Sequence, residues 1–318
     1  MGRPGTGLVT GRARVHVAYV LASVVGAGAF LYPFWLPAEA RLATAHAGDA
    51  PLVAGLVGAL AVTAVMVEVR AGTMAGTDVA LLGVLSAMAG LLRLLDLPGG
   101  GSGIFFLVLL GAAAFGPRFG FLLGLFAMAL SAVVTGGIGP WLPFQMLVLA
   151  WLAAVLGALG RVTRRLRARV EVAILAAASW LAGFVYGAVI NLWSWPLTPG
   201  DGPLQWRPGL GFGGTLDHYW AFYVTTSLAW DAAGATANLV AVAVLGGPVL
   251  ATLRRFAHRL DPVVELEPST EGADPSAAHP RPRSTPAQPG DQVVGRRRGS
   301  PVPVGGLHPK PQPGPSPT

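Results

Sequence analysis

Apolar runs that are long enough to cross a lipid bilayer recur along this sequence. Residues 15–35 and 170–192 are two of them, and each has about the 20 residues that a membrane-spanning helix needs. Hydrophobic residues make up 53% of the chain and charged residues only 12%, whereas soluble domains carry about 25% charged residues. The sequence therefore predicts an all-α, polytopic protein of the lipid bilayer.

The ends of the chain differ from its middle. Residues 1–70 contain two apolar runs, 15–35 and 51–67, which predict an N-terminal transmembrane hairpin. A signal peptide is the alternative for the first run, because arginines precede it; the run is longer than a typical signal core, which favours the hairpin. Residues 261–318 hold fourteen prolines and almost no apolar run, so we expect a disordered cytoplasmic tail.

Residues 78–258 form the predicted membrane core. Its six predicted helices are 79–95, 104–115, 119–134, 144–159, 170–192 and 219–245, and the last of these can continue through residues 246–248 into the basic turn at 254–259. The second of these is too short to cross a bilayer alone, and it ends at once in Gly116, Pro117 and Arg118. Short helices joined by glycine-containing turns are typical of a core that encloses a cavity open at one face.

The distribution of arginine predicts the orientation. If the N-terminus is inside and eight helices alternate, thirteen arginines fall on inner segments and only Arg41, Arg93 and Arg207 on outer ones. Inner loops of membrane proteins carry the excess of basic residues. We therefore expect a multi-pass cell-membrane protein with both termini in the cytoplasm.

The net charge of +7 does not indicate a nucleic-acid partner. The six basic and six acidic residues of the segment 261–318 cancel, so the whole excess lies in the membrane part, where orientation requires it. The chain has no cysteine, which excludes a disulfide framework, a cysteine-based metal site and a thiol nucleophile. We expect no metal and no cofactor.

Aromatic and polar residues near the predicted outer face suggest where a ligand binds. The connection 193–220 carries four tryptophans, and long connections are usually functional or disordered. We therefore expect a loop that covers a ligand; an interfacial aromatic belt is the alternative. Polar residues inside a membrane are costly, so Asp231 and Asn238 are candidates for ligand contact. Hydrogen bonds between helices are the alternative role for both residues. The candidate substrate-binding residues are Phe105, Trp141, Gln145, Asn191, Trp193, Trp195, Asp217, His218, Tyr219 and Asp231.

Patterns expected of an enzyme or of an energy-coupling motor are missing from the sequence. Ser131, Ser179 and Ser227 have no His or Lys partner at similar depth, and neither a GxSxG elbow nor a GxxxxGK[ST] loop occurs. We expect the chain not to be an enzyme. A stand-alone secondary transporter or channel for a small solute is the alternative function, although no internal repeat supports it.

Several segments together resemble one family. These are "LLRLLDLPGG" at 91–100, "FGPRFGFLLG" at 115–124, "SAVVTGGIGPWLPFQM" at 131–146 and "GATANLVAVAVLGGPVLATLRRF" at 234–256. They resemble the substrate-binding S component of energy-coupling factor (ECF) transporters over about residues 79–258. The resemblance implies a six-helix subunit that captures a vitamin or related micronutrient and works with a transmembrane coupling subunit and two cytoplasmic ATPase subunits.

The resemblance also implies a coupling face and a substrate. The family's Ala-xxx-Ala pattern on the first core helix is matched here by Gly83-xxx-Ala87, overlapped by Ser86-xxx-Gly90. Small residues four apart let two helices approach closely in lipid; an internal packing groove is the alternative. The turn "GGIGPWLPFQM" is similar to the cobalamin-associated branch, while riboflavin, another vitamin or an unknown solute stay open.

Overall fold

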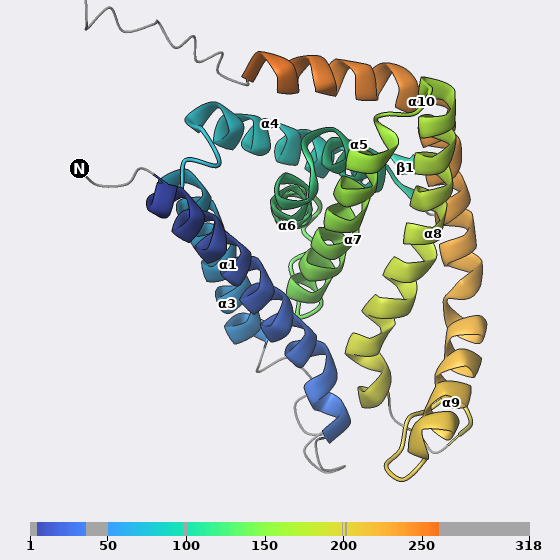
Figure 1. Cartoon of the computed structure of the whole chain (residues 1–318). Helices are drawn as coiled ribbons and strands as arrows, with labels where there is room; N and C mark the ends of the chain where they lie inside the picture. The colour runs from blue at the N-terminus through green and yellow to red at the C-terminus, as the bar shows by residue number, and fades with distance from the viewer. Residues whose placement is uncertain (1–4, 36–49, 98–100, 199, 201, 261–318) are drawn as a thin grey trace, which may run out of the picture. The chain divides into compact units, whose positions relative to one another are not determined.

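The computed structural model describes residues 5–35, 50–97, 101–198, 200 and 202–260, and this part of the chain is helical (Figure 1). The predicted tail 261–318 lies outside the described residues. The helices α3 to α8 begin and end within a few residues of the predicted apolar runs. Their bounds are α1 Gly5–Leu31, α3 Ala50–Arg70, α4 Gly76–Leu92, α5 Gly103–Phe115, α6 Pro117–Thr135, α7 Leu142–Thr163, α8 Ala168–Ser194, α9 Gly211–Thr226 and α10 Leu228–Leu260.

Six of the described helices are long and apolar enough to cross a membrane: α1, α3, α6, α7, α8 and α10. The apolar helices α4 and α5 are shorter. Between them, β1 (Asp96–Leu97) and β2 (Gly101–Ser102) form a two-residue antiparallel pair. The chain is therefore a multi-pass, helical membrane protein, as the sequence predicts.

The helices α5, α6 and α7 form the centre of the core, and two glycines allow their close packing. Gly116 separates α5 from α6 with a φ of +97°, a conformation that other residues avoid. Gly124 of α6 lies against the backbone of α7, where an added Cβ would be 2.7 Å from the Ala150 Cα. Small residues at such contacts let membrane helices pack backbone to backbone.

The hairpin of α1 and α3 packs against this core (Figure 1). Phe30 of α1 meets Phe144 of α7 edge to face, with ring centroids 4.9 Å apart. Trp151 of α7 donates a hydrogen bond from Nε1 to Ser23 Oγ of α1 at 3.1 Å. The N-terminal hairpin is thus joined to the core by both apolar and polar contacts.

The prediction of one continuous helix from 219 onward is wrong at its N-terminal part, while the expected continuation through Pro248 is present. The helix breaks at Ser227, so that α9 ends at Thr226 and α10 begins at Leu228 and continues past Pro248 to Leu260. The side chains of Thr225 and Thr226 bond back to carbonyls four residues earlier, which competes with regular helix geometry. Ser227 itself accepts a hydrogen bond from Asn191 of α8 at 2.7 Å.

The prediction that 193–220 is a loop is also only partly right. Helix α8 extends to Ser194, the 3₁₀ turn η2 covers Trp195–Leu197, and α9 takes up the second half of the segment. Aromatic residues spaced four apart, Tyr219 and Tyr223, stack at 6.5 Å along α9. Such pairs stabilise a helix, although Gly211, Gly213 and Gly214 at its start disfavour one.

Candidate functional site

A cavity of about 310 Å³ lies among α5, α7, α8 and α10, next to the end of α4. Its wall combines aromatic, charged and amide side chains from helices far apart in the sequence. The polar and aromatic residues that line it are Arg93, Ser102, Phe105, Gln145, Tyr186, Trp230, Asp231 and Asn238. This combination of an apolar wall with a few convergent polar groups is typical of a small-molecule site.

Several polar atoms on the cavity wall are buried without a hydrogen bond from the described residues. They are the side-chain oxygens Oγ of Ser102, Oδ2 of Asp231 and Oδ1 of Asn238. Buried polar atoms in native proteins nearly always have a partner, and an unpaired one is costly. Of these three atoms, Asn238 Oδ1 can accept a hydrogen bond from a molecule in the cavity, and Ser102 Oγ can donate or accept one. In contrast, Asp231 Oδ2 lies against Gly187, and the Asp231 carboxylate is hydrogen-bonded to Tyr223.

Asp231 is held in place by its neighbours on α8 and α9. Its carboxylate lies directly against Gly187 of α8, in space that any larger residue there would fill. Burial raises the pKa of Tyr223 on α9, and the nearby Asp231 carboxylate raises it further, so Tyr223 stays neutral at physiological pH. Elsewhere on the wall, the rings of Phe105 and Tyr186 meet edge to face, with their centroids 4.9 Å apart.

Arg93 supplies a positive charge to the cavity wall. It follows α4, and its Nη1 lies 3.4 Å from Met128 Sδ of α6. Among the described residues that line the cavity, the ionisable side chains are Arg93 and Asp231, so the wall offers one basic and one acidic group.

Two of the predicted aromatic residues, Trp195 and Tyr219, lie in η2 and α9 rather than on the cavity wall. We call Phe34, Trp195, Trp206 and Tyr219 the α9 aromatic cluster. Trp195 is 1% exposed, its ring centroid lies 4.9 Å from that of Tyr219, and its Nε1 donates to Leu204 O at 2.8 Å. Phe34 contacts Trp195 and Trp206 at 6.0 and 5.4 Å, so this cluster also joins the N-terminal hairpin to the loop.

The ten candidate residues therefore divide by location. Phe105, Gln145 and Asp231 line the cavity, while Trp195 and Tyr219 belong to the α9 aromatic cluster. Trp141 and Trp193 pair at 6.4 Å. The remaining three lie in neither group. Asn191 donates a hydrogen bond to Ser227, a ring nitrogen of His218 lies 2.8 Å from Gln205 O, and Asp217 is exposed.

Sequence reasoning missed Arg93, Ser102 and Tyr186 as cavity residues. Arg93 could have been identified from the sequence, because it is a charged residue at the end of an apolar run, on a predicted outer side that has few arginines. Ser102 and Tyr186 carry none, because only the packing of α5 against α8 brings them to the same wall. Asn238, for which ligand contact and helix packing both stood open, lines the cavity.

The four candidate coupling residues lie on two faces of α4. Gly83 and Ala87 are exposed beside the exposed apolar residues Val84 and Met88. Ser86 and Gly90 are buried, and an added Cβ at Gly90 would lie 3.1 Å from the backbone of α6. The Ser86-xxx-Gly90 pattern therefore packs inside the protein, whereas the Gly83-xxx-Ala87 pattern lies on the exposed surface of α4.

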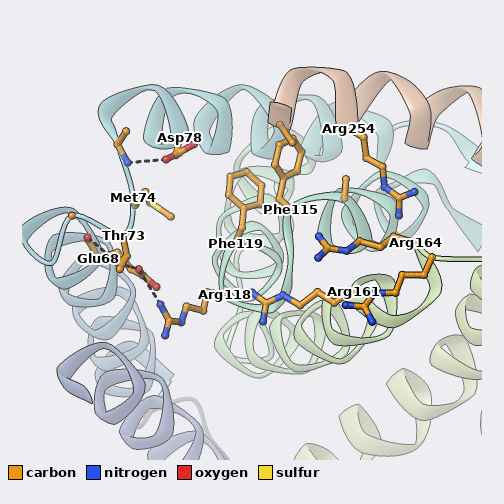
Figure 2. Close-up of a pocket in the computed structure, with 15 residues that line it drawn as sticks. Glu68, Thr73, Met74, Asp78, Phe115, Arg118, Phe119, Arg161, Arg164 and Arg254 are labelled. Carbon is orange, nitrogen blue, oxygen red and sulfur yellow. Dashed lines mark hydrogen bonds and ion pairs between the residues drawn. The ribbon is translucent and has the colours of Figure 1, made fainter. Parts of the chain in front are cut away.

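A larger cavity of about 930 Å³ lies at the arginine-rich end of the helices. Figure 2 shows Arg118 directed toward Glu68 at one side of it and Arg161, Arg164 and Arg254 at the other. Arg118 Nη1 is 3.7 Å from Glu68 Oε2. The two cavities thus differ in chemistry, since the smaller offers one basic and one acidic group and the larger is strongly basic.

Comparisons with known proteins give one match. A family model described as "ECF transporter, substrate-specific component" matches residues 77–246, more than half of the chain. No curated protein and no solved structure matches this chain. The matched segment begins in α4 and ends within α10, so it includes every helix that lines the 310 Å³ cavity and leaves out α1 and α3.

Proposed function

The chain belongs to the substrate-specific components of ECF transporters, and from this premise we propose that it captures its substrate in the 310 Å³ cavity among α5, α7, α8 and α10. Members of this family are membrane components of importers rather than enzymes. The arginine-rich end carries the larger cavity, and the positive-inside rule assigns that end to the cytoplasm. Both termini would then be cytoplasmic, and the smaller cavity would be reached from outside.

The observation that carries this proposal is the set of unpaired oxygens on the cavity wall. Asp231 and Asn238 lie seven residues apart on the same face of α10. The buried Oδ1 of Asn238 has no partner among the described residues, whereas the Asp231 carboxylate is hydrogen-bonded to Tyr223. A substrate with an N–H or O–H donor would satisfy Asn238. Phe105 and Tyr186 offer ring faces and edges to a planar group.

The size of the cavity narrows the substrate class. A volume of about 310 Å³ lies at the lower end of the range for ligand pockets, roughly 300–1,000 Å³. We therefore propose a vitamin or related micronutrient of one or two rings with several hydrogen-bond donors. Cobalamin, which the sequence resemblance suggests, would fit only after the cavity had opened widely, so smaller vitamins are the first to test.

The partners follow from the family. S components work with ECF energy-coupling components, and we propose a transmembrane coupling subunit and two cytoplasmic ATPases for this chain. The exposed Gly83–Ala87 face of α4 is the proposed contact with the coupling subunit. Uphill, ATP-independent uptake by the isolated chain would instead favour a stand-alone secondary transporter.

Calorimetry on the purified chain tests the cavity. A panel of B vitamins, including riboflavin and cobalamin, identifies a ligand, and the variants Asp231→Asn and Asn238→Ala are then titrated with it. Each should weaken binding by about tenfold or more, because hydrogen bonds to buried charged or amide groups are lost. Asp217→Asn is the matched control, since Asp217 is exposed. Unchanged binding in both cavity variants would place the site elsewhere.

A further inference from the structure

A deep apolar groove lies between the N-terminal hairpin and the core. Its volume is about 1,050 Å³, and its walls come from α1 on one side and from α6 and α7 on the other. The apolar residues that shape it include Val20 and Val24 of α1, Phe121 of α6, and Trp151 and Val155 of α7. All of these residues belong to segments that are long and apolar enough to span a membrane.

The apolar groove is open to its surroundings at membrane depth. Val24 and Val155, on opposite walls, are each 63% exposed. In a bilayer such surface is covered by lipid chains, because water is absent there. A groove of this kind, unlike a flat helix face, has walls on two sides that can hold one acyl chain.

One end of the groove continues into the basic cavity. Both cavities are lined by Thr73, Arg118 and Arg161. The basic cavity adds Arg164 and Arg165, both of which are exposed. The apolar groove therefore leads directly into a cluster of arginines, at the level where the membrane ends and the arginine-rich surface begins.

Most of these arginines have no acidic partner among the residues that the structure describes. The ion pairs of the described residues use Arg118 with Glu68 and Arg254 with Glu171, which leaves Arg161, Arg164 and Arg165 uncompensated. The Arg161 guanidinium is positioned against the α5–α6 turn, about 3.0 Å from where a Cβ at Gly116 would be. A guanidinium is suited to bidentate binding of a phosphate.

We propose that an anionic phospholipid binds here, with an acyl chain in the groove between α1 and α7 and its phosphate at Arg161 and Arg164. A soluble phosphate would use only the basic end, and an uncharged lipid only the apolar end. Of these three ligands, the anionic lipid alone has both an acyl chain for the apolar groove and a phosphate for the adjoining arginines. Basic pockets between helices at the cytoplasmic surface are known to hold lipid head groups of this charge.

The proposed lipid site is independent of the substrate cavity. One wall of the groove is α1, which precedes the segment 77–246 that matches the family model. The lipid would fill the space between the N-terminal hairpin and the core. It would thus strengthen a contact that otherwise depends on the Glu68–Arg118 pair, the Trp151–Ser23 hydrogen bond and aromatic contacts.

Native mass spectrometry of the full chain in detergent tests the charge requirement. The probes are dioleoyl phosphatidylglycerol and dioleoyl phosphatidylcholine. We expect the anionic lipid to bind at least about tenfold more tightly, and the double variant Arg161→Gln/Arg164→Gln to lose most of that preference. Arg169→Gln/Arg255→Gln is the matched control, because neither residue lines the groove or the basic cavity. Equal binding of the two lipids to the unmodified chain would overturn the proposal.

A second pair of variants tests the groove itself. Val24→Trp fills the groove with a bulky ring and leaves every arginine in place, so it should weaken phosphatidylglycerol binding severalfold. Val240→Trp, at an exposed position on α10, should not. Glycerol 3-phosphate supplies the head group without the chains and should not raise the melting temperature, whereas phosphatidylglycerol should raise it. Stabilisation by glycerol 3-phosphate as large as that by the lipid would identify a soluble-phosphate site instead.

Discussion

Arg254 contacts both carboxylate oxygens of Glu171, with Nη1–Oε2 and Nη2–Oε1 distances of 2.8 and 2.6 Å. The pair joins the last part of α10 to the first turn of α8. Glu171 is 3% exposed and also accepts a hydrogen bond from Thr163 of α7 at 3.1 Å. One carboxylate thus connects three helices at the arginine-rich end.

Removing one member of this pair should destabilise the protein strongly. Arg254→Ala leaves Glu171 buried without its counter-charge, which costs about 3–5 kcal/mol for buried pairs. Thermal unfolding in detergent measures the effect, and Arg255→Ala, at an exposed neighbouring position, is the control. The double variant Arg254→Ala/Glu171→Ala should lose less than the sum of the single losses. Additive losses would show that the two side chains do not interact.

The close contact of α6 with α7 should not tolerate a larger residue at Gly124. A Cβ there would lie 2.7 Å from the Ala150 backbone, so Gly124→Ala must push the helices apart, at a cost of about 1–3 kcal/mol. Gly55→Ala on α3 is the control, because an added Cβ meets nothing within 4 Å and alanine favours a helix. The melting temperatures of the two variants should therefore move in opposite directions.

Some of the fold could be predicted from the sequence because apolar runs set the helices directly. The run 144–159 became α7, which covers Leu142–Thr163, and the run 104–115 became α5. The break at Ser227 was not predicted, and Ser227 accepts a hydrogen bond there from Asn191 on another helix. The hydropathy pattern contains no information on such a tertiary contact, and it predicted one continuous helix.

The cavity was only partly predictable for a similar reason. Asp231 and Gln145 were identified because polar residues in a membrane are costly. The sequence assigned Trp195 to a ligand-covering loop, whereas the structure buries it in the α9 aromatic cluster. A tryptophan that binds a ligand and one that holds a loop to a helix have the same sequence signature, and only their neighbours distinguish them.

Trp195→Ala should therefore mainly lower the stability of the fold rather than weaken substrate binding directly. Its ring is fully buried, and truncation of such a ring costs about 3–5 kcal/mol. Trp220→Ala is the matched control, because Trp220 is 61% exposed and should have little effect on unfolding. Raising the salt concentration should change neither result much, since screening acts on charges. A melting temperature unaffected by Trp195→Ala would contradict the observed packing.

The exposed face of α4 gives the sharpest test of coupling. Gly83 and Ala87 are exposed, and an added Cβ at Gly83 meets nothing within 4 Å, so Gly83→Trp/Ala87→Trp should leave the isolated chain folded. The same rings should block close approach by a coupling helix, which requires small residues. Substrate binding by the purified chain should persist, whereas ATP-dependent uptake by the assembled transporter should be lost.

A matched control for that variant exists in the N-terminal hairpin. Gly55 and Ala59 of α3 repeat the Gly-xxx-Ala spacing and are also exposed, but they lie outside the segment that matches the family model. Gly55→Trp/Ala59→Trp should therefore preserve uptake. The comparison separates a specific coupling face from a general sensitivity to bulky residues at the lipid surface. Uptake that survives Gly83→Trp/Ala87→Trp but fails in the control would move the coupling contact from α4 to the hairpin.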